Sequence, residues 1–175
     1  MLEIIAAYLR NTCGLIANTG RYLNKEYNSQ KTTDLLITFP GEPDKLPVAM
    51  DYTCHCPFLP NYRNPAARDF TKHMSEQEAR KTRKHAEDCS DMNREFVGVP
   101  GTTLGDLGTD TFWDIIDSAT MKAITTAQIQ GKDAFDINAA KQNMITAIQG
   151  EVTRYTGTLV FNLSSRATTH TTTTE

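Results

Sequence analysis

The chain has 175 residues, 39% of them hydrophobic, which is enough to bury the core of one domain but short for two. Its formal net charge of −3 excludes a general attraction to nucleic acids or anionic membranes, so any DNA binding has to come from a local basic patch. The sequence has no apolar run near the roughly 20 residues of a membrane-spanning helix and no N-terminal secretory pattern, so we expect an intracellular protein, nuclear if the source is eukaryotic.

The N-terminal segment predicts one helix followed by a less regular stretch. Its apolar residues stand at helical spacing and are followed by Gly14 as a stop: Leu2, Ile5, Ala6 and Leu9. Residues 15–23 show little periodicity and are compatible with a strand or one arm of a hairpin. Residues 33–39 favour β-structure and run into the turn residues 40–44, which predicts a strand and a turn.

The segment 47–56 alternates in the manner of a half-buried strand. The face expected to point into the core carries Val48, Met50, Tyr52, Cys54 and Cys56. The opposite face carries Asp51, Thr53 and His55. We therefore expect this strand to pair with the strand at 33–39.

The middle of the chain predicts a loop, a helix and a further strand. Residues 57–65 hold three prolines and read as an irregular loop. Ser75 with Glu78 has the pattern of a capping box, which predicts a helix from about Ser75 to Cys89. Residues 94–100 form another short strand, which ends at a Pro-Gly pair.

The C-terminal third predicts two helices, one capped by Thr109 or Asp110 and one capped by Asp136. We expect an α/β core over 1–108, a C-terminal helical extension over 109–165 and a disordered tail over 166–175, because the tail has almost no large apolar side chains. Reduced thiols are expected in the intracellular setting at all four cysteines: Cys13, Cys54, Cys56 and Cys89.

Two aspartates, Asp34 and Asp51, interrupt apolar strand segments, where an unpaired carboxylate is costly. Carboxylates on neighbouring strands can bind a hard cation such as Mg²⁺ and leave positions open for water and a phosphate. The alternative is structural, with each carboxylate hydrogen-bonded to backbone or paired with a cation. Lys81 and Lys84 lie three residues apart on the predicted helix and can address the same site; otherwise they belong to a solvated basic face.

In order and spacing, these motifs resemble the endonuclease domain that follows the reverse transcriptase in site-specific non-LTR retrotransposons. The resemblance covers about residues 2–116 and rests on Thr33-Asp34 with its apolar strand, Asp51-Tyr52-Thr53, Lys81-x-x-Lys84-His85 and the strand at 96–99. Thr33 stands where that family usually has proline, and His85 stands where it has tyrosine. The family belongs to the PD-(D/E)xK nuclease class, in a branch whose lysine lies on the helix.

The resemblance implies a restriction-endonuclease-like fold, a small mixed sheet with flanking helices, and C-terminal helices beyond it. It also implies a DNA-nicking endonuclease dependent on Mg²⁺ or Mn²⁺. Asp34 and Asp51 would bind the metal with the backbone carbonyl of Tyr52, and Lys81 and Lys84 would position water or phosphate. A reverse transcriptase would be supplied by another chain or by a part missing from a fragment. The competing hypothesis is a catalytically inactive binding or structural module.

Two further sets of residues suggest binding. Cys54, Cys56, His85 and Cys89 would suffice for a tetrahedral zinc site, although buried cysteines commonly serve in packing without a metal. The basic residues Arg63, Arg68 and Lys72, interleaved with aromatic side chains, are candidates for nucleic-acid binding, with a solvated loop as the alternative.

Overall fold

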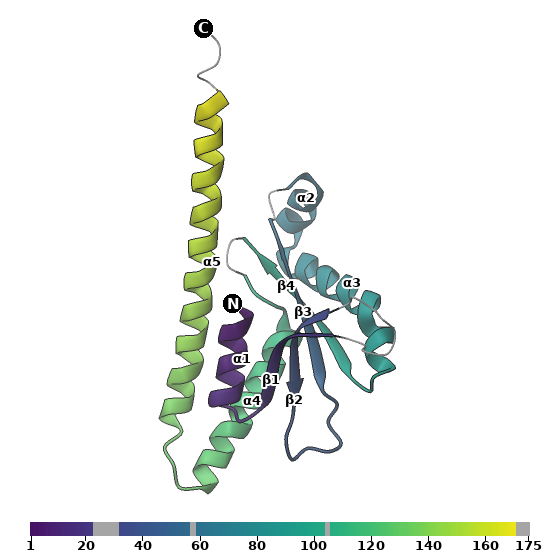
Figure 1. Ribbon diagram of the computed structural model, residues 1–175, viewed down its shortest axis with the longest axis vertical. Coiled ribbons are helices and arrows are strands. Elements are labelled where there is room, and N and C mark those ends of the chain that lie inside the picture. Colours follow the sequence, from purple (N-terminus) through teal and green to yellow (C-terminus); the bar gives the residue numbers. More distant parts are fainter. Residues whose placement is uncertain (23–31, 57–58, 104–105, 171–175) are drawn as a thin grey trace.

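The computed structural model describes residues 1–22, 32–56, 59–103 and 106–170 and shows an α/β domain with one four-stranded mixed sheet (Figure 1). Its elements in chain order are α1 (Leu2–Asn11), β1 (Ile16–Tyr22), β2 (Thr32–Thr38), β3 (Val48–His55), α2 (Pro60–Arg68), α3 (Phe70–Ser90), β4 (Glu95–Thr102), α4 (Asp110–Ile129) and α5 (Phe135–His170).

The sheet has the order β1-β2-β3-β4. The first three strands form an antiparallel meander, and α3 then carries the chain back so that β4 pairs with β3 in parallel. The strands expected around Asp34 and Asp51 are therefore neighbours, and the strand containing Phe96 joins the same sheet. The expectation of a small mixed sheet flanked by helices is confirmed.

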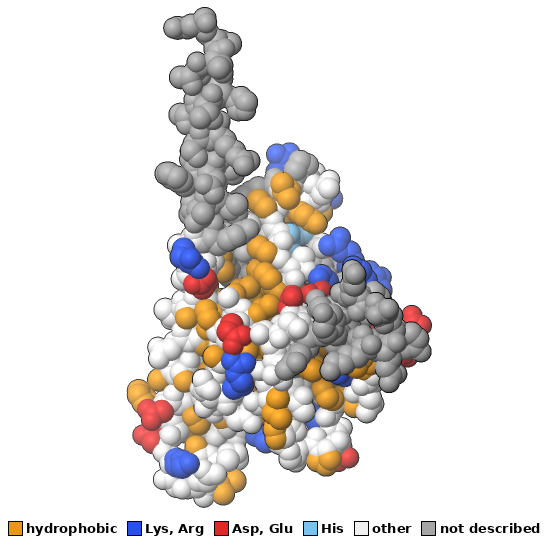
Figure 2. All heavy atoms as spheres, in the orientation of Figure 1, with side chains coloured by type: hydrophobic (Ala, Val, Ile, Leu, Met, Phe, Trp, Pro, Cys, Tyr) orange, Lys and Arg blue, Asp and Glu red, His pale blue; other side chains and the backbone are white. Residues whose placement is uncertain are grey.

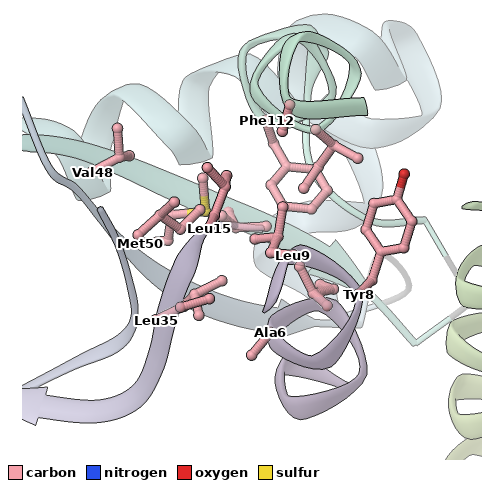
Figure 3. Packing of buried hydrophobic residues seen from close by; sticks show 14 of the residues in the cluster. Ala6, Tyr8, Leu9, Leu15, Leu35, Val48, Met50 and Phe112 are labelled. Atoms are coloured by element: carbon pink, nitrogen blue, oxygen red, sulfur yellow. The ribbon is translucent and has the colours of Figure 1, made fainter. Parts of the chain in front are cut away.

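Helices cover both faces of the sheet (Figure 1). The large core lies between the sheet and the helices α1, α4 and α5. Leu9, Leu35, Met50 and Phe112, labelled in Figure 3, are almost fully buried in it, and so is Ile148 of α5. A small cluster on the other face joins the sheet to α3 through Ala49, Cys89 and Phe96. The C-terminal helices thus share the main core with the sheet.

The segment 57–65 was expected to be a loop, and this expectation is wrong for its described part. Helix α2 begins with Pro60 in its first turn. Backbone N–H groups in a first turn have no acceptor within the helix, so the N–H that proline lacks is not needed there. The expected start of α3 at Ser75 is also wrong. Asp69 is the N-cap, and its carboxylate accepts a hydrogen bond of 2.9 Å from the Lys72 backbone N–H.

The two C-terminal helices begin close to the expected positions. Thr109 is the N-cap of α4, but its hydroxyl donates to the Glu78 carboxylate of α3 in place of a capping bond. Helix α5 continues through His170, so the disordered tail expected from residue 166 is wrong as far as that residue; each residue added to an existing helix costs less order than starting one. Residues 171–175 lie outside the described part.

Alternation along β3 is confirmed for its first five residues: Val48 and Met50 are buried in the main core and Tyr52 packs against it, while Ala49 and Asp51 face α3. The expected core position of Cys54 is wrong, because β3 runs past the end of the core and leaves this side chain exposed. The four cysteines are free thiols. Within the described helices, no stretch has the length and apolar character needed to cross a membrane.

Candidate functional site

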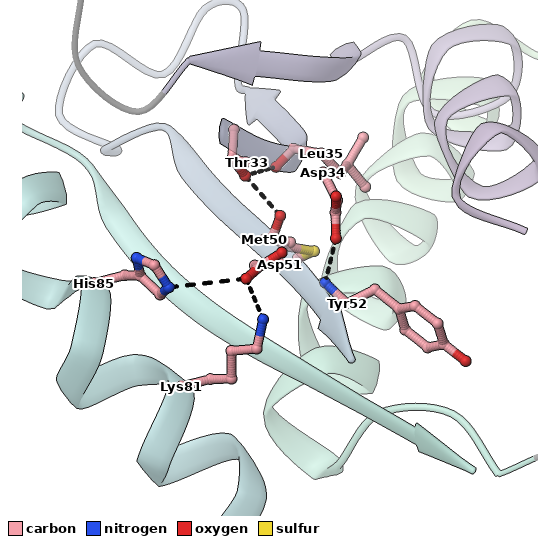
Figure 4. A network of polar contacts seen from close by, with 8 residues as sticks. All are labelled: Thr33, Asp34, Leu35, Met50, Asp51, Tyr52, Lys81 and His85. Atoms are coloured by element: carbon pink, nitrogen blue, oxygen red, sulfur yellow. Dashed lines mark hydrogen bonds and ion pairs between the residues drawn. The ribbon is translucent and has the colours of Figure 1, made fainter. Parts of the chain in front are cut away.

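The site forms where β2 and β3 begin to separate. Their backbone ladder ends at the pair Leu35 and Met50, and one further step would place Asp34 opposite Asp51. Side chains hold the strands together beyond that point: the Thr33 hydroxyl donates to the Met50 carbonyl at 2.6 Å, and the Tyr52 backbone N–H donates to Asp34 Oδ2 at 2.7 Å (Figure 4). Thr33 thus bridges the strands, a contact that proline, which has no hydroxyl, could not make.

Helix α3 brings two basic side chains to the second carboxylate. Lys81 Nζ forms an ion pair with Asp51 Oδ2, and His85 Nε2 lies 3.9 Å from the same oxygen (Figure 4). The side chains of Asp51 and Lys81 remain 16% and 24% exposed, whereas His85 is buried against the Phe96 ring. The ion pair is therefore partly screened by solvent, and water can reach it.

Gly98 of β4 sets the distance between α3 and the sheet. It is the register partner of Asp51, and a Cβ atom placed on it would lie 2.6 Å from the Lys81 Cβ and 3.0 Å from the Glu78 carbonyl oxygen. Only a residue without a side chain allows the helix backbone this close. The short spacing is what lets Lys81 reach Asp51.

Burial and the neighbouring Asp51 change the protonation of Asp34. Burial, together with the hydrogen bond to Asp51 and its negative charge, raises the pKa of Asp34 to about 6, although the Tyr52 N–H and the Lys81 charge act in the opposite direction. Below that pH, Asp34 is neutral and can share its proton with Asp51. Above it, two negative charges face each other with one nearby ammonium group.

This raised pKa predicts a pH-dependent stability. The folded state binds the Asp34 proton more tightly than the unfolded chain does. The resulting contribution to stability is fully present below pH 3.8 and is lost as the pH rises through about 6. Asp34→Asn, which stays neutral and can still accept from Tyr52, should therefore be more stable than the wild type at pH 8 and similar to it at pH 4. Thermal melts across this range test it, with the exposed Asp44→Asn as control; a difference that does not change with pH would contradict it.

The donor set suits a hard divalent cation. Mg²⁺ is commonly held by one or two carboxylates and keeps several waters, and a divalent charge would remove the repulsion between Asp34 and Asp51. Asp34 has to lose its proton before it can bind a cation. The Tyr52 backbone N–H is bonded to Asp34. The use of the Tyr52 carbonyl as a further metal ligand stays a prediction.

The structure separates the two candidate lysines. Lys81 reaches Asp51, whereas Lys84 is exposed one turn later on α3, and no described contact joins it to the carboxylates. The sequence pattern did not distinguish Lys81 from Lys84 as the lysine at the carboxylates. It indicated His85 only as a departure from a motif or as a zinc ligand. Gly98 was missed altogether, because its role depends on the packing of Lys81 and Glu78, which lie 17 and 20 residues earlier in the chain on α3.

The expected nucleic-acid-binding residues are exposed on neighbouring helices, Arg63 and Arg68 on α2 and Lys72 in the first turn of α3. None of them reaches the carboxylates. Figure 2 shows Lys and Arg side chains gathered over α2 and α3. Sequence reasoning missed two exposed members of this basic surface, Arg80 and Arg83, although their spacing on a charged helix is visible in the sequence.

The expected zinc set does not come together. His85 and Cys89 face the sheet from α3, with Cys89 packed against Ala49 and Phe96, while Cys54 is exposed on the opposite face of β3. In the described ranges, no group of three or more His, Cys, Asp or Glu side chains is placed to hold a metal ion. A cation between Asp34 and Asp51 would thus depend on water, backbone or phosphate oxygen for its other ligands.

Searches for related proteins add no family to this geometry. No protein-family model matches the chain, nor does any curated protein or solved structure. The functional argument therefore rests on the arrangement of Asp34, Asp51, Lys81 and His85.

Proposed function

We propose that this protein is a DNA endonuclease that nicks one strand and depends on Mg²⁺ or Mn²⁺, with a restriction-endonuclease-like core similar to the reverse-transcriptase-associated nuclease of non-LTR retrotransposons. The observation that carries the proposal is the convergence of two carboxylates from adjacent strands with a lysine from the following helix. The order of strands and helices around them supports it, since it is the order that the resemblance requires.

In this proposal each residue has a distinct task. Asp34 and Asp51 would hold the cation, which when bound supplies an activated water and balances charge on the phosphate. Lys81, already beside the carboxylates, would orient the scissile phosphate or the attacking water. His85 would hold the Asp51 carboxylate in place from the buried side. The exposed cations of α2 and α3 would bind the DNA backbone and compensate for the acidic net charge.

The nick would leave a 3′ hydroxyl, the group that a reverse transcriptase extends. Such a polymerase is the partner that the resemblance implies, supplied by another chain or by a longer form of this protein. DNA itself is the substrate class.

A second candidate function is a catalytically inactive module that binds DNA or docks a partner. The contacts that favour it are the ion pair between Asp51 and Lys81 and the hydrogen bond from Tyr52 to Asp34, because both carboxylates then have structural partners. A cavity of about 350 Å³ between the start of α3, α4 and α5 is lined by other residues and does not include these carboxylates. The two functions make opposite predictions for DNA cleavage.

The test is a plasmid-nicking assay. The purified chain, incubated with supercoiled DNA, should produce nicked circles in Mg²⁺ or Mn²⁺ and none in EDTA. Bound Mn²⁺ without nicking would support the inactive module and overturn the nuclease. Cleavage that persists in EDTA would point to a contaminant or to another mechanism.

The two lysines provide a matched comparison in the same assay. Lys81→Met should lower the nicking rate by about 100-fold while Mn²⁺ binding persists, because removing one charge-stabilising donor from a transition state has effects of that order. Lys84→Met removes the same charge from the same helix, away from the carboxylates, and should change the rate less than about threefold at fixed salt. Equal effects of the two substitutions would mean that Lys81 acts only through general DNA attraction.

A further inference from the structure

Two histidines form a buried pair at the far end of β3, outside the site described above. His55 ends β3 and His73 lies in the second turn of α3, and they are only 7% and 2% exposed. Their Nε2 atoms lie 3.2 Å apart, and their rings are nearly perpendicular, at 83°. Three elements meet here, because the ring of Tyr62 from α2 contacts both imidazoles at centroid distances of 5.2 and 5.6 Å.

We propose that His55 and His73 bind a single borderline transition-metal ion, Zn²⁺ in the first instance, through their two Nε2 atoms. Zinc–imidazole bonds are about 2.0–2.1 Å long, so two imidazoles on one tetrahedral zinc hold their nitrogen atoms about 3.3 Å apart. The pair already has this separation. An ion could therefore enter between the rings with little movement of either helix or strand.

The protonation of the pair is compatible with a metal ligand. Burial, followed by electrostatic interaction with His73 and Arg80, holds the pKa of His55 below its usual range, so this imidazole is neutral near pH 7 and has a lone pair available. Without metal, one Nε2 carries the proton of the hydrogen bond and the other accepts it. With metal, both rings would carry their proton on Nδ1, so the donor ring moves its proton from Nε2 to Nδ1 and neither ring loses a proton.

Ligand chemistry separates this site from the carboxylate site. Imidazole nitrogen favours Zn²⁺, Cu²⁺ and Ni²⁺, whereas Mg²⁺ prefers oxygen, so each site selects a different class of ion. No third His, Cys, Asp or Glu joins the pair in the part of the chain that the structure describes, and the remaining positions would be filled by water or an outside ligand. Figure 2 shows a small area of histidine surface just below α2.

The ion would link two elements, β3 and α3. β3 carries Asp51 four residues before His55, and α3 carries Lys81 eight residues after His73. A bond from each element to one metal would fix the height of α3 on β3 at one end, while Gly98 fixes it in the middle. The proposal does not depend on the nuclease function, since a metal staple would serve either function equally.

The experiment is a calorimetric titration of the full chain with Zn²⁺ in excess Mg²⁺, which keeps the carboxylates occupied or screened. We expect one zinc per chain, with affinity lowered at least tenfold by His55→Gln and by His73→Gln, since loss of a ligand costs at least as much as loss of its supporting contacts, about 10–100-fold. His85→Gln, a buried histidine on the same helix, is the matched control and should bind zinc as the wild type does.

Other results would overturn the proposal. Zinc binding that is absent in the wild type, unchanged in His73→Gln, or lost only in His85→Gln or a cysteine variant would place the ion elsewhere or nowhere. Imidazole ¹⁵N spectra of the wild-type chain avoid any folding defect of the variants. On adding Zn²⁺, the Nε2 resonances of two histidines should shift together, and spectra that do not move would equally refute the site.

Discussion

Asp51→Ala should abolish DNA nicking, with a loss of 100-fold or more, and should strip most of the affinity for Mn²⁺. Asp51 is one of two carboxylates available to the cation, and it also positions the Lys81 ammonium group. Folding should survive the change. Removing one of two facing negative charges relieves repulsion on Asp34, which offsets the loss of the partly exposed ion pair with Lys81.

The measurement combines the nicking assay, Mn²⁺ titration and a thermal melt on the same preparations. Asp44→Ala is the control, because Asp44 is an exposed carboxylate in the turn between β2 and β3 and changes the net charge equally. Nicking that survives Asp51→Ala would remove the basis of the proposed enzyme. A variant that loses both activity and its folded transition would show that the Asp51 and Lys81 pair is structural, as the inactive-module hypothesis requires.

The adjacency of Asp34 and Asp51 was predictable because strand alternation is a local property. One core receives the side chains of Leu35, Ile37, Val48 and Met50. Because side chains alternate along a strand, Asp34 before Leu35 and Asp51 after Met50 lie on the opposite face of the two neighbouring strands. A polar residue in such a run has a high cost unless it finds a partner, so it marks a site even without relatives.

The contribution of α3 was less predictable, because it depends on how a helix is placed on a sheet. The Ser75 capping pattern competes with Asp69, and only packing determines which of the two residues begins the helix. Lys81 and Lys84 have nearly equal sequence signals, yet the rotation of the helix over β4 brings one of them to Asp51. The segment 57–65 was misassigned for a related reason. Prolines disfavour strands and helix interiors, yet Pro60 fits the first turn of α2 and Pro65 lies inside that helix.

The histidine pair was also unpredictable from the sequence, because it too depends on how α3 is placed on the sheet. His55 lies on the same strand face as Asp51, which alternation predicts, but its partner is 18 residues away on a helix whose start was misplaced. A metal site made by a strand and the next helix has no fixed spacing in the sequence, unlike two ligands on one helix turn. Such pairs are found only once the helix is placed in space.

Gly98→Ala should lower the free energy of unfolding by about 1–3 kcal/mol, the usual cost of forcing an extra methyl group into a packed contact. The new Cβ would meet the Glu78 carbonyl and the Lys81 Cβ, both of which belong to the helix framework and cannot rotate away. α3 must then lift from β4, and Lys81 should lose contact with Asp51, so nicking should fall even at temperatures where the variant is fully folded.

Gly150→Ala is the matched control, because a Cβ at this position of α5 meets no atom within 4 Å. The same chemical change there should leave nicking intact and stabilise the helix by up to about 1 kcal/mol, since alanine is the better helix former. Denaturant unfolding of both variants, paired with the nicking assay, separates close packing from a general effect of alanine. If Gly98→Ala matched the wild type in both measurements, the approach of α3 to β4 would not control the position of Lys81, and the site would have to tolerate a wider range of helix positions than the Asp51 contact allows.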